Sequence, residues 1–114
     1  MPVVEYFEYN PTFAKALAEM WNRSSSGWNG TVFNSSEAKV LKEEEESIHL
    51  KLWLAISEAQ VIGYVKLTRY PEEQGVAYIH MLSVDPLWHD KGIGKALVKM
   101  CVLEAAKLGY QRLD

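Results

Sequence analysis

Hydrophobic and polar residues follow one another in patterns that predict the secondary structure of this chain. β-Branched and aromatic residues over 3–9 predict a first strand. Asn10 and Pro11 suit the start of a helix, and apolar residues recur at helical spacing from Phe13 to Trp21. The polar, glycine-containing segment 22–36 predicts a loop. The chain therefore opens with a strand, a helix and a long loop.

A second helix is predicted over 36–47. Asn34 and Glu37 have the spacing of a capping box at its start. The acidic run Glu43 to Glu46 lies in its second half. We interpret this run as a solvated helix face; a surface that binds cations is the alternative.

The second half of the chain predicts three consecutive strands and a helix. Short connections between the strands indicate antiparallel neighbours. A helical pattern follows from Gly92, with Gly109 placed to end it and the start of a last strand over 110–114. The three consecutive strands are predicted over 49–56, 61–70 and 76–84.

Composition narrows the class of protein. The chain has 114 residues, enough for one domain, and a net charge of −3, which does not suggest a nucleic-acid partner. The N-terminus lacks the basic start of a signal peptide, and no apolar run reaches membrane-spanning length. A single cysteine, Cys101, excludes an internal disulfide and suits a reducing compartment. We therefore expect a cytoplasmic protein with no membrane partner.

The segment 89–97, HDKGIGKAL, places two glycines between a predicted strand and a predicted helix. Such a junction is typical of backbone that approaches a phosphate. A Walker A loop does not fit, because His89 stands where its first glycine belongs and Ala96 where it needs Ser or Thr. A dinucleotide fingerprint fits poorly, because Leu97 replaces its third glycine and the preceding strand is antiparallel to its neighbour.

The wider segment 82–98, LSVDPLWHDKGIGKALV, resembles the acyl-CoA signature of the Gcn5-related N-acetyltransferase (GNAT) superfamily. That signature is a (Gln/Arg)-x-x-Gly-x-(Gly/Ala) loop between the fourth strand and the third helix. Gly92 and Gly94 match its small residues, whereas His89 occupies the position that is usually Gln or Arg. The order of predicted elements matches too, so the resemblance covers the whole chain.

The resemblance implies an α/β fold over residues 1–114, a single domain with a mostly antiparallel sheet flanked by helices. The implied order is β-α-α-β-β-β-α-β, with the C-terminal part of the family fold missing. It also implies acetyl-CoA as co-substrate, an amine acceptor that attacks directly, and no metal. The residues it assigns to acetyl-CoA are Leu82, Ser83, Val84, His89, Asp90, Lys91, Gly92, Ile93, Gly94 and Lys95. The first three are implied to act through their main chain, because the family's fourth strand carries a bulge whose outward N–H groups hold the pantetheine arm.

Elementary physics supports phosphate binding at this loop. The first N–H groups of a helix lack partners within the helix and carry partial positive charge. A pyrophosphate accepts several of these bonds at once, and the absence of Cβ at Gly92 and Gly94 lets the backbone approach it closely. Lys91 and Lys95 add positive charge. A plain glycine-containing loop before a core helix is the alternative.

Catalysis in this family needs a base for the amine, often a carboxylate on the fourth strand. No carboxylate lies between Val76 and Val84, and His80 is the candidate instead, since an unperturbed imidazole titrates near ~6.5. Because side chains alternate along a strand, we expect His80 to share one strand face with Tyr78, Leu82 and Val84. A structural histidine bonded to a nearby hydroxyl or carbonyl is the alternative.

The acceptor and the acid that protonates the thiolate are less defined. Trp28 and Phe33, in the predicted loop, either form a wall of the acceptor site or cover the edge of the core. The family's usual acid is a tyrosine beyond the fifth strand, for which this chain shows no equivalent. We expect Tyr110 to pack against the helix end instead.

The family fold continues past its fifth strand, of which residues 110–114 provide only the start. We therefore expect a fragment of a longer acetyltransferase, or a sheet completed by a second copy at its open edge. The isolated chain is then expected to self-associate or be marginally stable, and to acetylate amines poorly. Two other functions stay open: a non-catalytic acyl-CoA-binding or regulatory module, and a protein-association domain that needs no ligand.

Overall fold

The computed structural model of the chain describes residues 3–23, 36–46, 50–70 and 72–114. Its elements follow the predicted order along the chain. They are β1 (Glu5–Glu8), the 3-10 turn η1 (Pro11–Phe13), α1 (Ala14–Arg23), α2 (Glu37–Glu46), β2 (Lys51–Ser57), β3 (Gln60–Arg69), β4 (Val76–Val84), the 3-10 turn η3 (Pro86–Trp88), α3 (Ile93–Lys107) and β5 (Arg112–Leu113).

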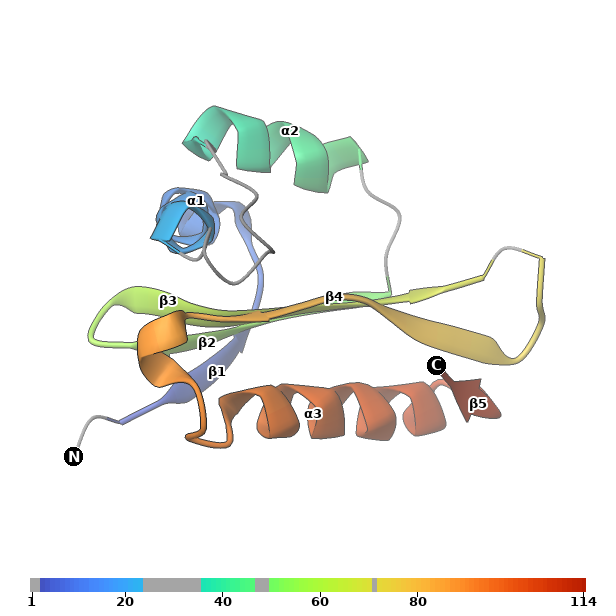
Figure 1. The fold of residues 1–114 in the computed structure, drawn as a ribbon. Coiled ribbons are helices and arrows are strands. Elements are labelled where there is room, and N and C mark those ends of the chain that lie inside the picture. Colours follow the sequence, from blue (N-terminus) through green and yellow to red (C-terminus); the bar gives the residue numbers. More distant parts are fainter. Residues whose placement is uncertain (1–2, 24–35, 47–49, 71) are drawn as a thin grey trace.

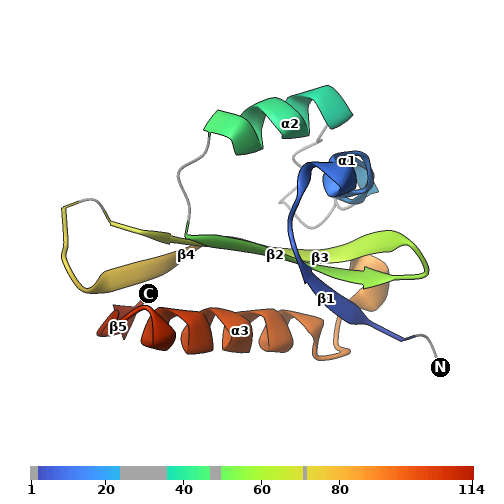
Figure 2. The same cartoon turned by 180° about the vertical axis from the view of Figure 1, so that it is seen from behind.

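The five strands form one sheet in the order β1-β2-β3-β4-β5. Neighbouring strands are antiparallel from β1 to β4, and β5 runs parallel to β4. Helices α1 and α2 lie over one face of the sheet and α3 lies along the other (Figure 1). The view from behind shows the same three layers (Figure 2). The predicted α/β fold with a mostly antiparallel sheet is therefore confirmed.

Each face of the sheet has its own apolar core. On the side of α1 and α2, Leu17 and Met20 pack with Tyr64 of β3, all fully buried. On the side of α3, Leu97 and Cys101 pack against the other face of the same strands, and both are also fully buried. Burial on both faces explains why β3 is buried from Val61 to Thr68.

The helix starts show which capping predictions the fold uses. The Asn10 side-chain oxygen accepts a hydrogen bond from the Thr12 N–H at 2.9 Å, which caps η1 as predicted. At α2 the cap is Ser36, whose Oγ accepts from the Lys39 N–H at 3.2 Å. Asn34, the predicted capping residue there, lies outside the described residues.

The end of α3 is closed by a glycine, as predicted. Gly109 has φ +89°, and its N–H donates to the Ala106 carbonyl at 3.1 Å. The Tyr110 N–H donates to the Ala105 carbonyl at 2.9 Å, which completes a Schellman motif. The Tyr110 side chain packs against the core beside α3, which confirms its expected structural role.

The acidic run on α2 is not uniformly solvated, contrary to the prediction. Glu43 and Glu45 are exposed, but the Glu44 side chain is only 4% exposed. Its carboxylate lies 3.4 Å from Lys66 Nζ and accepts a hydrogen bond from the Tyr64 hydroxyl at 3.3 Å. Burial, reinforced by this carboxylate, raises the pKa of Tyr64 well above its usual value. A buried lysine on β3 therefore has its counter-charge on α2.

The C-terminal side of the fold leaves apolar and backbone groups uncovered. In the described part of the chain, β5 pairs with β4 only at Val76 and Ala77. Val102 and Leu103 of α3 are 48% and 61% exposed. No described helix is long and apolar enough to cross a membrane.

The turn between β2 and β3 places two ordinary residues in the left-handed region, Glu58 at φ 51° and Ala59 at φ 64°. Both residues are strained there, and such hairpin turns favour Asn-Gly. We expect Glu58→Asn combined with Ala59→Gly to raise the free energy of unfolding by about 1 kcal/mol, measured by urea denaturation. The matched pair Glu72→Asn with Gln74→Gly, where neither original residue has a positive φ, should give no such gain.

Candidate functional site

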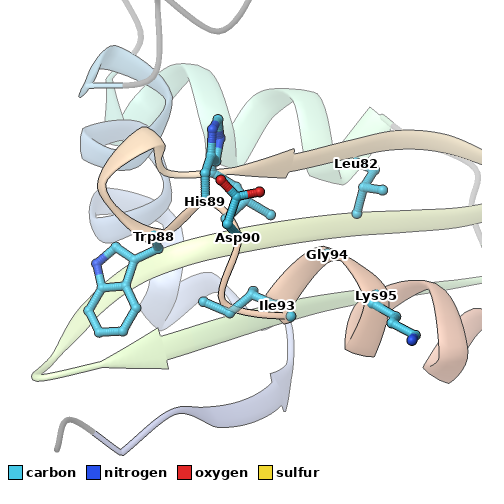
Figure 3. Close-up of a pocket in the computed structure, with 9 residues that line it drawn as sticks. Leu82, Trp88, His89, Asp90, Ile93, Gly94 and Lys95 are labelled. Carbon is cyan, nitrogen blue, oxygen red and sulfur yellow. The ribbon is translucent and has the colours of Figure 1, made fainter.

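A cavity of about 470 Å³ lies where the end of β4 meets the start of α3 (Figure 3). Of the ten residues that the sequence assigns to acetyl-CoA, all except Ser83 and Lys91 line it. Trp88, which was not predicted, lines it as well. Trp88 lies inside the signature segment 82–98, and this position in the sequence could have identified it. The structure therefore gathers most of the predicted cofactor residues around one cavity.

The start of α3 faces this cavity without a side-chain cap. Gly92 is the capping residue, with φ +80° and no side chain to accept a bond. The first helical bond there runs from the Ala96 N–H to the Gly92 carbonyl at 3.0 Å. The N–H groups of Ile93, Gly94 and Lys95 come before it and have no partner within the helix. This end of the helix is therefore free to bind an anion.

Glycines permit this geometry for different reasons. A Cβ on Gly92 would meet nothing within 4 Å, so lack of space does not require glycine at this position. The positive φ of Gly92 does require it. A Cβ on Gly94 would lie 3.6 Å from Val84 Cγ2, an ordinary contact, so a methyl group fits there. In β3, a Cβ on Gly63 would lie 3.0 Å from Ile93 Cγ2. Gly63 thus lets the first turn of α3 pack closely on the sheet.

The charges around the cavity are mixed. Lys91 and Lys95 are exposed and form no ion pair with a described residue. Asp90, at φ +63°, places a carboxylate at the same cavity. A carboxylate repels a phosphate, so only the backbone of Asp90 suits an anionic ligand. At the cavity itself, this one negative charge is opposed by Lys95 and by the positive start of α3.

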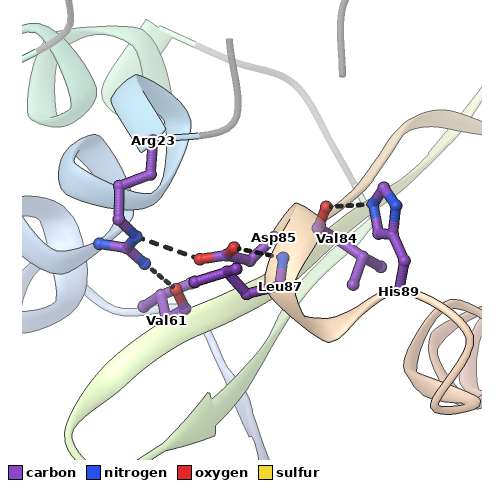
Figure 4. Close-up of polar contacts among 6 residues, drawn as sticks. All are labelled: Arg23, Val61, Val84, Asp85, Leu87 and His89. Carbon is purple, nitrogen blue, oxygen red and sulfur yellow. Dashed lines mark hydrogen bonds and ion pairs between the residues drawn. The ribbon is translucent and has the colours of Figure 1, made fainter. Parts of the chain in front are cut away.

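His89 is held by the end of β4. Its Nε2 lies 2.9 Å from the Val84 carbonyl oxygen and donates to it (Figure 4). A carbonyl accepts only from a protonated nitrogen, so Nδ1 is the ring atom left for a ligand. Nδ1 can donate to a phosphate only when the ring is protonated.

Along the free edge of β4, the backbone N–H groups of every second residue point away from β3. The Asp85 N–H donates to the Ile62 carbonyl at 2.8 Å, so Val84 and Gly63 form a non-hydrogen-bonded pair. The N–H groups of Leu82 and Val84 therefore point away from β3, toward the cavity side. The backbone of Ser83 points toward β3, and its contact with the cofactor, expected from the sequence, does not fit this arrangement.

A β-bulge interrupts β4 at His80. Met81 pairs with Lys66 and Ile79 pairs with Leu67, so His80 has no partner residue on β3. A bulge inserts one residue and shifts the alternation of side chains beyond it. Side-chain directions on the two sides of His80 therefore cannot be read from residue parity.

Because of this bulge, the expectation that His80 shares a strand face with Leu82 and Val84 is wrong. Leu82 and Val84 line the cavity beside α3, whereas the His80 ring lies edge-on to Tyr78 with ring centroids 6.0 Å apart. Tyr78 in turn stacks on Tyr70 at 4.3 Å. His80 is exposed and forms no hydrogen bond with a described residue. The alternative to a catalytic role was a structural hydrogen bond of His80, and His80 forms none with the described residues.

The remaining sequence predictions concern a wall of the acceptor site and metal binding. Trp28 and Phe33 lie outside the described residues. Within the described residues, no group of three or more His, Cys, Asp or Glu side chains could hold a metal ion. The candidate site therefore consists of the cavity, the free edge of β4 and the bulge at His80.

Solved structures with this fold include several acetyltransferases. A GNAT acetyltransferase from Staphylococcus aureus has 18% identity and a TM-score of 0.76, over 95% of this chain and 70% of its own. An aminoglycoside acetyltransferase from a soil metagenome, in complex with sisomicin, has 16% identity and a TM-score of 0.75, over 97% and 75%. An aminoglycoside N-acetyltransferase in complex with CoA has 16% identity and a TM-score of 0.74, over 99% and 76%.

No curated protein sequence matches this chain. The model of the acetyltransferase (GNAT) family does match, over residues 14–114. That range contains the signature segment, both helices that cover the first face of the sheet, and all of β2 to β5. The resemblance that was drawn from residues 82–98 is confirmed, and this chain belongs to the acetyltransferase (GNAT) family.

Proposed function

We propose that this chain is an acyl-CoA-dependent N-acetyltransferase that moves the acetyl group of acetyl-CoA to an amine by direct attack. The observation that carries the proposal is the uncapped start of α3, open to a cavity that continues along the free edge of β4. The family and the CoA complex of a structural neighbour support the same co-substrate.

The residues around the cavity fit a pyrophosphate. The N–H groups of Ile93, Gly94 and Lys95 converge as donors, and the Lys95 side chain adds charge. The outward N–H groups of Leu82 and Val84 suit the amide-containing arm of CoA and the carbonyl of its thioester. Preorganised donors of this kind lower acyl-transfer barriers by ~3 kcal/mol.

His80 is proposed to accept the proton of the amine. Its ring is exposed and forms no hydrogen bond with a described residue, so a nitrogen is available. The amine nitrogen forms a bond to the carbonyl carbon, the carbon–sulfur bond breaks, and the thiolate is left to take up a proton. We assign no residue of this chain to that last proton transfer.

A non-catalytic acyl-CoA-binding or regulatory module is the second candidate. It is favoured by one observation, the absence of any carboxylate along β4 from Val76 to Val84. Such a module would keep the cavity and the helix start but would not transfer the acetyl group.

Calorimetric titration with acetyl-CoA, followed by thiol release with a panel of amines, tests the proposal. We expect saturable binding and slow amine-dependent release of CoA thiol. Burial raises the pKa of the Cys101 thiol to about 11, so the protein contributes little thiol background. Binding without release would favour the non-catalytic module, and no binding would exclude both functions. Sedimentation of the same sample tests whether two copies pair at the sheet edge, which is the alternative to a fragment of a longer protein.

The proposed setting is the cytoplasm, where acetyl-CoA and a reduced Cys101 are compatible. The proposed partners are acetyl-CoA and an amine acceptor, without nucleic acid, membrane or metal. The acceptor is defined only as an amine.

A further inference from the structure

Asp85 fixes the direction of the chain where it leaves β4 and enters the signature loop. Its Oδ1 accepts a hydrogen bond from the Leu87 N–H at 3.0 Å, and its carbonyl accepts from the Trp88 N–H at 2.8 Å. The Asp85 side chain is only 5% exposed. A carboxylate buried to this extent is stable only with a compensating charge.

That compensating charge comes from a distant part of the chain. Arg23 is the last residue of α1, and its Nε donates to Asp85 Oδ2 at 3.1 Å (Figure 4). Its Nη2 donates to the Val61 carbonyl at 2.9 Å. One guanidinium thus joins the end of α1, the start of β3 and the turn after β4. Arg23 was given no role by the sequence, because its partner follows 62 residues later.

The ion pair lies next in the chain to residues that line the cavity. Val84 precedes Asp85, Trp88 follows it by one short turn, and both line the cavity. An unpaired carboxylate at Asp85 would repel an anion bound in the cavity, and salt screens a buried charge less than an exposed one. Arg23 cancels this repulsion and also holds the turn in place.

We infer that Arg23 is a positioning residue for the anionic part of the cofactor, acting by neutralising Asp85 at the back of the phosphate loop. The inference rests on the proposed binding of CoA. A purely structural role for Arg23 makes a different prediction: its loss would lower stability but leave the CoA affinity of the folded chain unchanged.

Three variants separate the charge of Arg23 from its geometry. Arg23→Gln removes the charge, and we expect CoA affinity to fall about fivefold at low salt, with a smaller loss at high salt. Arg23→Lys keeps the charge but not the fork of donors, so it should lose stability and keep affinity. Arg69→Gln, at the exposed far end of β3, is the matched control for loss of one positive charge.

The decisive variant combines Arg23→Gln with Asp85→Asn, which keeps an oxygen for the Leu87 N–H. We expect it to restore affinity to within about twofold of wild type, because the uncompensated charge is gone. Affinity is measured by calorimetry with CoA at temperatures where urea unfolding shows each variant folded. The inference is overturned if Arg23→Gln binds like Arg69→Gln, or if the double variant stays as weak as Arg23→Gln. Failure of wild type to bind CoA would instead refute the proposed function, and this inference with it.

Discussion

Replacing Gly94 with aspartate should abolish CoA binding while making the folded chain more stable. Gly94 is the second residue of α3, where an acidic side chain favours the helix by its dipole and loss of glycine reduces backbone entropy. These effects together should raise the free energy of unfolding by roughly 1 kcal/mol. The same carboxylate would stand among the N–H groups proposed to bind the pyrophosphate. Two like charges 4 Å apart repel by about 4 kcal/mol near a protein surface.

Calorimetry with CoA and urea denaturation measure the two effects separately. A repulsion of that size predicts a loss of affinity of more than about 100-fold. Gly94→Ala is the matched control: its methyl meets Val84 at an ordinary distance, so we expect similar stabilisation with affinity kept within a few-fold. Gly94→Asn has the size of aspartate without its charge and reports the steric part alone. An aspartate variant that binds CoA as well as the alanine variant would show that phosphates do not bind at this helix start.

The fold could be predicted from the sequence because its signals are local. Apolar periodicity, Asn10 before Pro11 and Gly109 after α3 each act within a few residues, and all appear in the structure. The cavity could be located for the same reason. Its glycines, its lysine and its outward strand groups lie in one continuous segment, 82–98.

What could not be predicted depends on contacts between distant segments. Glu44 is one of four consecutive glutamates, and nothing local separates it from its exposed neighbours. Only Lys66 indicates the pairing, since a lysine between the apolar residues Val65 and Leu67 needs a counter-charge when it is buried. The ion pair between Arg23 and Asp85 also cannot be predicted from local sequence, because its two residues are far apart in the chain. Such pairings follow from the packing of α1 and α2 on the sheet.

The bulge at His80 is the other feature that sequence alternation misrepresents. A strand pattern assumes a period of two, and one inserted residue reverses every assignment beyond it. Parity therefore grouped His80 with Leu82 and Val84, although these line the cavity beside α3. The pattern of polar and apolar residues in β4 does not indicate the inserted residue, because Ile79 and Met81 on either side of His80 are both partly exposed.

Replacing His80 with alanine should lower acetyl-transfer turnover about 100-fold or more and leave CoA affinity nearly unchanged. The imidazole is exposed, so its removal leaves no cavity in the core. It is also absent from the lining of the cavity that is proposed to bind the phosphates. Stability and cofactor binding should therefore be preserved, and the loss should fall on kcat for the amine.

The pH dependence of turnover tests whether His80→Ala loses activity because the base is missing. If His80 accepts the amine proton, wild-type turnover rises with pH as the imidazole loses its own proton, and the variant lacks that ascending limb. His80→Gln, which keeps a hydrogen-bonding side chain but cannot titrate, should behave like the alanine variant. Tyr78→Phe tests whether the effect belongs to the neighbouring ring, since it keeps the contact and removes only the hydroxyl. Normal turnover of His80→Gln across the pH range would show that the bulge is architectural and that the amine loses its proton elsewhere.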